Sequence, residues 1–138
     1  MLEGQRVVSL VFDLLKADTG AGGVNTLVSG RIFRDVVPQA ALLPAITVTL
    51  VSGTDTNTVG GVRVFQMALV DVRVVSEGVS YANSIADRVD TVIQNAGGTK
   101  EAVDIVELRR DQVTAFVENE AGKLYSHIVA SYRSEAYA

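Results

Sequence analysis

The amino-acid sequence predicts an α+β domain in which two main helices pack on one face of an antiparallel β-sheet, in the order α-β-β-α-β-β-β. Two segments have the three- and four-residue apolar spacing of amphipathic helices, and several others alternate with the period of two that is typical of strands. The chain has 138 residues, of which 48% are hydrophobic. A chain of this size buries roughly 70% of the surface that it exposes when unfolded, which allows one proper core. We therefore expect a single domain over residues 1–138.

The first helix is expected from Glu3 to Lys16. Its apolar residues recur at helical spacing and are Val7, Val8, Val11, Leu14 and Leu15. The acidic Glu3 near its start and the basic Lys16 near its end complement the helix dipole. Glycines at 20, 22 and 23 then permit backbone conformations that stop the helix. Residues 24–28 have room for one further helical turn.

Both prolines of the chain, Pro38 and Pro44, lie between residues 30 and 53. Each removes a backbone donor, so neither suits the interior of a paired central strand, and we expect a short extended piece followed by a loop. The first long strand then covers residues 45–52, where Ile46, Val48 and Leu50 alternate with their neighbours. Residues 53–61 are mostly glycine and small polar residues, which predicts a mobile loop between two antiparallel strands.

The strongest strand signal runs from Val62 to Val75 and is apolar on both faces at its middle. One face is mainly valine, and the other carries Phe65, Met67 and Leu69. Fourteen residues would span about 46 Å, so a bulge or a projecting end is expected. The two helices suffice for one face only. Either a second layer inside the domain or another chain covers the other face, and we favour a subunit contact.

The second main helix is expected between Ser80 and Ala96, because its apolar residues again follow helical spacing. Two or three strands complete the domain, over residues 102–109, 113–118 and 124–133. Residues 119–123 form a hairpin loop between the last two strands. Residues 134–138 are expected to form a short C-terminal tail.

Catalytic, cofactor and metal sites have no support in the sequence. There is no cysteine, and the only histidine, His127, is expected on a strand surface or in a subunit contact. The run Gly-Ala-Gly-Gly-Val-Asn-Thr lacks the Gly-Lys-Ser/Thr ending of a phosphate loop and follows a helix, so a turn is the better interpretation. The net charge of −4 argues against tight nucleic-acid binding through a basic surface. No apolar run is long enough to span a membrane, and no leader peptide is visible, so a cytoplasmic origin is the default expectation.

Residues 14–53 carry a resemblance to a known family. After the Leu-Leu-Lys-Ala-Asp end of the first helix come a glycine-rich turn, then LVSGRIF and VVPQAALLPAITVTLVSG. This stretch is similar to the amino-terminal half of the long-tailed phage tail terminator family, also called tail completion or tail-to-head joining proteins. The spacing from Arg31 to Pro38 to Pro44 carries the similarity. Beyond Gly53 only the order of elements is similar.

The resemblance implies a virion structural protein without enzymatic activity. Copies of the chain would form a homo-oligomeric, hexameric ring that ends tail-tube polymerisation and joins the tail to the head. The implied partners are the tail tube protein and a head-completion (connector or stopper) protein. DNA would pass through the ring without sequence-specific binding. The implied place is the head–tail junction of the virion tail, after assembly in the host cytoplasm.

The ring hypothesis assigns two sites. The subunit interface is assigned to Phe65, Met67 and Leu69. The partner-docking loop is assigned to Thr54, Asp55, Thr56, Asn57 and Thr58. The alternative function is a small-molecule-binding or regulatory α+β domain, because the pattern of sheet and helices alone permits it.

Overall fold

The computed structural model describes residues 3–38, 41–61 and 63–137. The helices are α1 (Glu3–Ala17), α2 (Val24–Leu27) and α3 (Val79–Ile93). The strands are β1 (Ile32–Arg34), β2 (Ala45–Asn57), β3 (Arg63–Ser76), β4 (Gly98–Lys100), β5 (Val103–Ile105), β6 (Arg109–Glu120) and β7 (Lys123–Tyr137). Val62, the expected start of the long strand, and Ala138, the end of the expected tail, lie outside the described residues.

The strands form one sheet in the order β1-β2-β3-β7-β5-β4, and β6 pairs with β7 off this path. Strand β7 has β3 along one edge, while its other edge pairs first with β6 and then, at Ala136 and Tyr137, with β5. The α+β class with helices on one face of the sheet is confirmed, and the described strand pairs are antiparallel except at the β1 edge. The short β1 runs parallel to β2 through Ile32–Ile46 and its neighbours, because the proline-containing connection returns the chain in the same direction.

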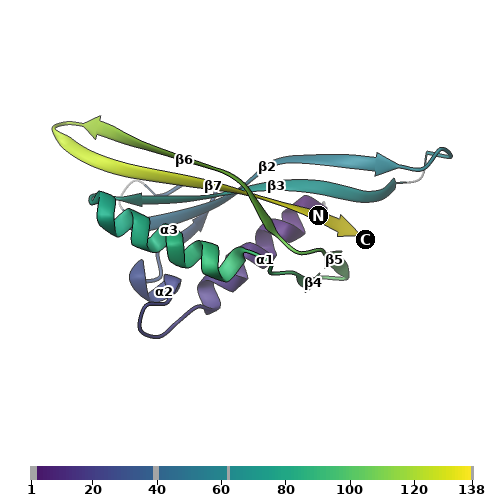
Figure 1. Cartoon of the computed structure of the whole chain (residues 1–138), viewed down its shortest axis with the longest axis horizontal. Coiled ribbons are helices and arrows are strands. Elements are labelled where there is room, and N and C mark those ends of the chain that lie inside the picture. The colour runs from purple at the N-terminus through teal and green to yellow at the C-terminus, as the bar shows by residue number, and fades with distance from the viewer. Residues whose placement is uncertain (1–2, 39–40, 62, 138) are drawn as a thin grey trace.

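All three helices lie on one side of the twisted sheet, and the core fills the space between them (Figure 1). The buried valines of α1, such as Val7 and Val11, and Ile85 and Val89 of α3 meet the even-numbered positions of β3 and β7. Alternation along a strand sends the odd-numbered positions to the opposite face. We call that opposite side the open face. No helix of the described chain is long and apolar enough to cross a membrane.

Two hairpins extend the sheet in opposite directions (Figure 1). The hairpin of β2 and β3 continues well beyond α1 at one end, and the hairpin of β6 and β7 forms the other end. The pairing of β2 with β3 has two register shifts. One, between Leu50 and Ser52, lies in β2, and the other, between Thr56 and Asn57, leaves an extra residue in β3, the strand for which an irregularity was expected.

Two boundaries predicted from the sequence are wrong. Residues Gly53 to Asn57 continue β2 instead of opening a loop, because they pair with β3 from Ala68 to Arg63. Residues Ser134 to Tyr137 belong to β7 instead of a tail, and Ala136 is fully buried in the core. The alternation of Ser134 and Ala136 with larger residues continues the strand pattern to its end.

Two polar contacts fix the helices in place. Asp18, which follows α1, accepts two hydrogen bonds from Arg88 of α3, at 2.7 and 2.8 Å, and one from the backbone N–H of Val24 at 2.8 Å. The buried Tyr132 of β7 donates its hydroxyl proton to Asp90 of α3 at 2.9 Å. The first contact joins all three helices, and the second ties α3 to the sheet.

Candidate functional site

The apolar trio Phe65, Met67 and Leu69 lies on the open face, where no helix covers it. All three side chains are half-buried by their neighbours in the sheet. The ring of Phe65 packs against that of Tyr137, with centroids 5.3 Å apart. Met67 and Leu69 lie opposite Glu135 and Arg133 of β7. The trio is therefore an apolar surface with charged residues at its border.

The structure places the predicted docking residues directly beside this trio. Thr54 of β2 lies opposite Met67 of β3, and Thr56 lies opposite Phe65. Asp55 and Asn57 lie between and beyond them in the same strand, and only Thr58 lies in the turn. Thr54 and Thr56 are thus beside the trio on the open face, whereas Asp55 pairs with Gln66, whose side chain is on the helix side.

A buried glutamine holds the base of the β2–β3 hairpin against α1. The side-chain oxygen of Gln66 accepts a 2.7 Å hydrogen bond from the backbone N–H of Gly4, and its amide donates to Asp55 at 2.9 Å. Gly53 lies so close that a Cβ atom there would be 2.7 Å from the Gln66 amide carbon. The orientation of the hairpin is therefore fixed by packing in which Gly4 and Gly53 both need to lack a side chain.

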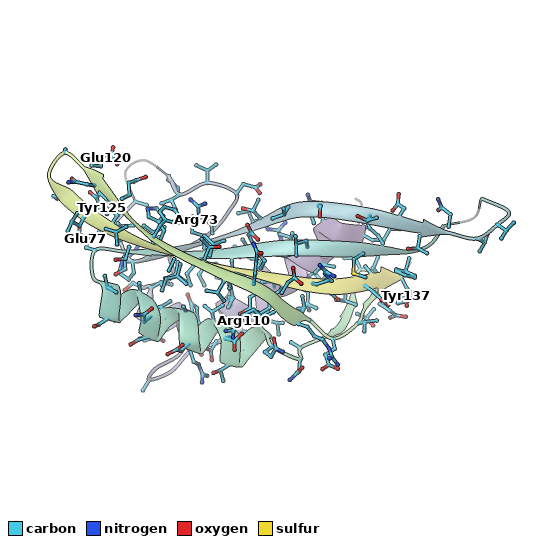
Figure 2. All side chains as sticks on the ribbon, turned by 45° about the horizontal axis from the view of Figure 1, so that its top comes forward. Arg73, Glu77, Arg110, Glu120, Tyr125 and Tyr137 are labelled. Carbon is cyan, nitrogen blue, oxygen red and sulfur yellow. The ribbon has the colours of Figure 1, made fainter. Side chains whose placement is uncertain are left out.

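A groove of about 670 Å³ lies on the open face, near the β6–β7 hairpin. Its floor is formed by β2, β3 and β7, the β1–β2 connection forms one wall, and the β6–β7 hairpin forms the other. The groove is lined by four carboxylates and by one guanidinium, that of Arg73. The carboxylates are those of Asp35, Asp71, Glu118 and Glu120. Figure 2 shows Arg73 near the middle of the sheet and Glu120 and Tyr125 near the hairpin end. The groove is therefore an acidic surface.

His127 lies under the edge of this groove, with its side chain only 10% exposed. Its ring stacks on Phe116 of β6 at 4.6 Å, and neither ring nitrogen has a hydrogen-bond partner. Glu118 is 3.8 Å from Nε2, which is too far for a hydrogen bond. Burial lowers the pKa of His127, although the nearby Glu118 carboxylate acts in the opposite direction. The expectation of a strand position is confirmed, but the side chain is buried.

The sequence reasoning missed β6 as a surface. All twelve of its residues are exposed, including Val113, Phe116 and Val117. The signal that could have found it is the uncharged run Val-Thr-Ala-Phe-Val, which has strong strand propensity and no helix nearby in sequence to cover it. Among the described residues, no group of three His, Cys, Asp or Glu side chains is arranged to hold a metal ion.

Comparison with known proteins identifies a family and solved structures with a similar fold. The family model described as Tail completion protein gp17 matches residues 9–133. A chain from the structure titled "Virion of native gene transfer agent (GTA) particle" is similar to this one with a TM-score of 0.69 and 20% sequence identity. The similarity covers 93% of this chain and 92% of the other, and at this identity it shows a shared fold. A search among curated proteins found no match.

Proposed function

We propose, from the premise that this chain belongs to the family of tail completion protein gp17, that its copies close into a ring at the end of the tail tube. Membership in the family makes the chain a structural protein of the phage tail, with its place in the virion tail. The proposal goes further. A hexameric ring, as in the tail terminators that the sequence resembles, ends polymerisation of the tube on one surface and receives a head-completion protein on the other.

The observation that carries the proposal is the uncovered apolar surface on the open face. Helices cover one side of the sheet, while Phe65, Met67 and Leu69 remain half-buried on the other. An apolar surface bordered by polar residues is typical of a protein–protein contact. A closed ring requires a contact repeated by rotation, with different surfaces on the two neighbours. We assign the trio to one side of that contact.

The substitution Met67→Lys tests this assignment. Glu135 lies opposite Met67, so a lysine gains an opposite charge across the strands, and the free chain should change in stability by less than about 1 kcal/mol. In the assembled ring, this lysine and Glu135 would both be removed from water, and the desolvation of two charges can exceed the attraction between them. Tail joining should therefore fail in complementation while urea unfolding of the free chain stays near normal.

Val36→Lys is the matched control, since Val36 is apolar and 72% exposed but lies on the connection between β1 and β2. It should leave joining intact. A large loss of unfolding free energy in Met67→Lys would instead mean that the trio belongs to the core of the domain. Normal joining by Met67→Lys would remove the trio from the ring contact.

We further propose that Thr54 to Thr58, at the outer half of the β2–β3 hairpin, dock a neighbouring tail or head protein. These residues are exposed in the free chain. Their small polar side chains bury little apolar surface that would offset the entropy lost on ordering. Amide hydrogen exchange should be faster here than in the rest of β2 and should slow in assembled tails. Equal exchange in both states would contradict docking.

The ring is proposed to leave a path for DNA. A lumen lined with lysine and arginine would hold the phosphates through counterion release, and the net charge of −4 is compatible with an acidic or neutral wall. A map of the ring should show few unpaired basic side chains along the lumen. A predominantly basic lumen would contradict this part of the proposal.

The alternative, a ligand-binding domain, has one specific observation in its favour. The volume of the acidic groove, about 670 Å³, is within the usual range for small-molecule sites. Its four carboxylates would select a cationic ligand. Raised melting temperature with a polyamine such as spermidine, lost in Asp71→Asn, would support this function. No shift at millimolar spermidine would leave the ring as the better proposal.

A further inference from the structure

The acidic groove on the open face has more negative than positive side chains around it. Four carboxylates line it, together with the guanidinium of Arg73. Lys123 lies opposite Glu120, which is near the tip of the β6–β7 hairpin (Figure 2), and adds a second positive charge beside the groove. Four negative charges against these two positive ones leave an excess of two. A hollow lined mainly by one sign of charge attracts ions of the opposite sign, so the groove favours a cationic occupant.

Two of these carboxylates, on opposite walls, form no ion pair with a lysine or arginine of the described chain. Asp35, on the β1–β2 connection, makes no side-chain hydrogen bond or ion pair with any described residue. Glu118, on β6, approaches the imidazole of His127 at 3.8 Å. The guanidinium of Arg73 lies over the ring of Phe116, 5.9 Å from its centroid. A cation that enters the groove therefore meets two carboxylates that are available to bind it.

His127 independently indicates a ligand at the same place. The residue is only 8% exposed, and it lines the groove. Neither of its ring nitrogens has a hydrogen-bond partner among the described residues. Buried polar side chains are nearly always hydrogen-bonded. An unpaired imidazole at the edge of an acidic groove therefore indicates that its partner comes from another molecule.

The hydrogen-bonding capacity of His127 favours a peptide over a small organic cation. A neutral imidazole has one N–H donor and one acceptor nitrogen. A polyamine offers donors only, whereas a peptide offers backbone N–H and C=O groups in addition to cationic side chains. The half-exposed side chain of Glu118 can turn away from Nε2 and admit such a group. Between the charges, the groove has apolar side chains such as Val37, Leu43 and Val75, which suit the methylene stems of lysine and arginine.

We propose that the acidic groove holds an extended segment of another tail protein that carries lysine or arginine. One cationic side chain of the segment binds Asp35, another binds Glu118, and its backbone pairs with His127. The occupant is a protein because this chain is a structural protein of the phage tail, and the carboxylates repel the phosphates of DNA. The exposed Val36 lies at the rim, outside this contact, so Val36→Lys keeps the carboxylates and should leave the segment bound. The proposal does not depend on the ring, whose contact is assigned to the trio.

A synthetic peptide tests the binding directly. The probe is a fluorescently labelled peptide, Gly-Ser-Lys-Arg-Lys-Arg-Ser-Gly, and its counterpart has glutamine at the four basic positions. Fluorescence anisotropy should show that the folded chain binds the basic peptide at least about tenfold more tightly than the glutamine peptide, because charge-assisted hydrogen bonds are the stronger ones. Equal binding of the two peptides would overturn the proposal.

Two double variants with the same net charge separate the groove from general attraction. Asp35→Asn with Glu118→Gln should weaken binding of the basic peptide at least about tenfold. Both changes are compatible with the fold, because asparagine tolerates the φ of 66° at position 35 and Glu118 is exposed. Asp87→Asn with Asp104→Asn is the matched control, at exposed positions of α3 and β5, and should bind as the original chain does. Equal weakening in both double variants would show attraction by net charge alone and would overturn the site.

The single histidine reports where the peptide binds. The imidazole C–H resonances of His127 should shift along the same binding curve as the anisotropy. Unchanged resonances at saturating peptide would place the peptide elsewhere and refute the assignment. Displacement of the peptide by an equal concentration of spermidine would give the groove to a small cation instead of a protein segment.

Complementation of tail joining tests whether the occupant belongs to the tail. Asp35→Asn with Glu118→Gln should reduce joining at least about tenfold with normal urea unfolding, while the double variant at Asp87 and Asp104 should join normally. Normal joining by a groove variant that no longer binds the peptide would overturn the assignment of a tail protein as the occupant. Met67→Lys tests the ring on a different surface, so a failure of the ring proposal would leave the peptide and NMR results unchanged.

Discussion

The packing of Gln66 against two glycines makes a quantitative prediction about Gly53→Ala. Gly53 lies in β2 with an extended backbone that any residue can adopt, so the substitution introduces no backbone strain. A Cβ atom there would lie 2.7 Å from the amide carbon of Gln66 and 2.8 Å from its oxygen. Van der Waals contacts between such atoms are usually about 3.5–4.0 Å. The Gln66 amide must therefore move.

The amide has little freedom to move without losing its partners. It accepts from the N–H of Gly4 at 2.7 Å and donates to Asp55 at 2.9 Å, and Gln66 is only 6% exposed. If it stays, overpacking costs about 1–3 kcal/mol. If it leaves, the buried N–H of Gly4 loses its acceptor, which costs about 1–3 kcal/mol as well. We expect Gly53→Ala to lower the free energy of unfolding by about 2 kcal/mol.

Urea unfolding of Gly53→Ala, measured in the original chain and in the Gln66→Ala variant, checks this reasoning. Gly60→Ala is the matched control, because the nearest atom to its Cβ would be 3.8 Å away. That change should be neutral or stabilise by up to about 1 kcal/mol. With Gln66→Ala already present, Gly53→Ala should become nearly neutral, which gives a coupling energy above about 1 kcal/mol. An equal loss in both backgrounds, or a Gly53→Ala variant as stable as Gly60→Ala, would refute the account.

Three titrations give further predictions. Burial and the hydrogen bond to Asp90 raise the pKa of Tyr132 above its ordinary value of 10.0, so the unfolded chain loses this proton first. Stability should be complete below about pH 10 and fall above it, and Tyr132→Phe should flatten that alkaline decline in unfolding free energy. Burial lowers the pKa of His127 below 6.5, so its contribution is present above pH 6.5 and is lost as the pH falls, which a proton NMR titration of this single imidazole can follow. The hydrogen bond from Arg88 lowers the pKa of Asp18 below 3.8, so its contribution is lost only as the pH falls through the lower folded value. Asp18→Asn should lower stability near neutral pH by about 1 kcal/mol, and by less at high salt, as urea unfolding would show.

The helices and the long strand could be predicted because their signals are local. The spacing of Val7, Val8 and Val11 in α1 and of Ile85 and Val89 in α3 defines the face that packs on the sheet. The alternation in β3 fixes which residues face the helices, since a strand has only two sides. The side of Phe65, Met67 and Leu69 could therefore be assigned before the fold was known.

The wrong boundaries have a different cause. Gly53 to Asn57 look like a loop because they are small and polar, yet Thr54 and Thr56 are β-branched and suit a strand once β3 supplies the partner edge. Ser134 and Ala136 are buried because this end of β7 lies between β3 and the segment of β5 that continues to Val106. In both segments the strand forms because it pairs with residues distant in the sequence. The residues near each segment in the sequence carry no information about that pairing.

The candidate surfaces depend on such distant pairing even more strongly. The acidic groove exists because Asp35 in one connection and Glu118 in a hairpin approach the same region of the sheet, from positions more than eighty residues apart. No spacing rule in the sequence brings these carboxylates together. The stacking of Phe116 on His127 likewise follows from the register of β6 on β7.

In this fold, a substitution can affect assembly and leave the stability of the single chain nearly unchanged. The core lies entirely on the helix side of the sheet, where residues such as Val70 and Tyr132 are fully buried. The trio lies on the other side, and β6 lies beside β7 at an edge of the sheet, where all of its residues are exposed. Substitutions at these two surfaces therefore remove little of the apolar burial that stabilises the single chain. In the proposed ring, this separation would let the free chain fold before it meets its neighbours, because the surfaces reserved for assembly contribute little to the core.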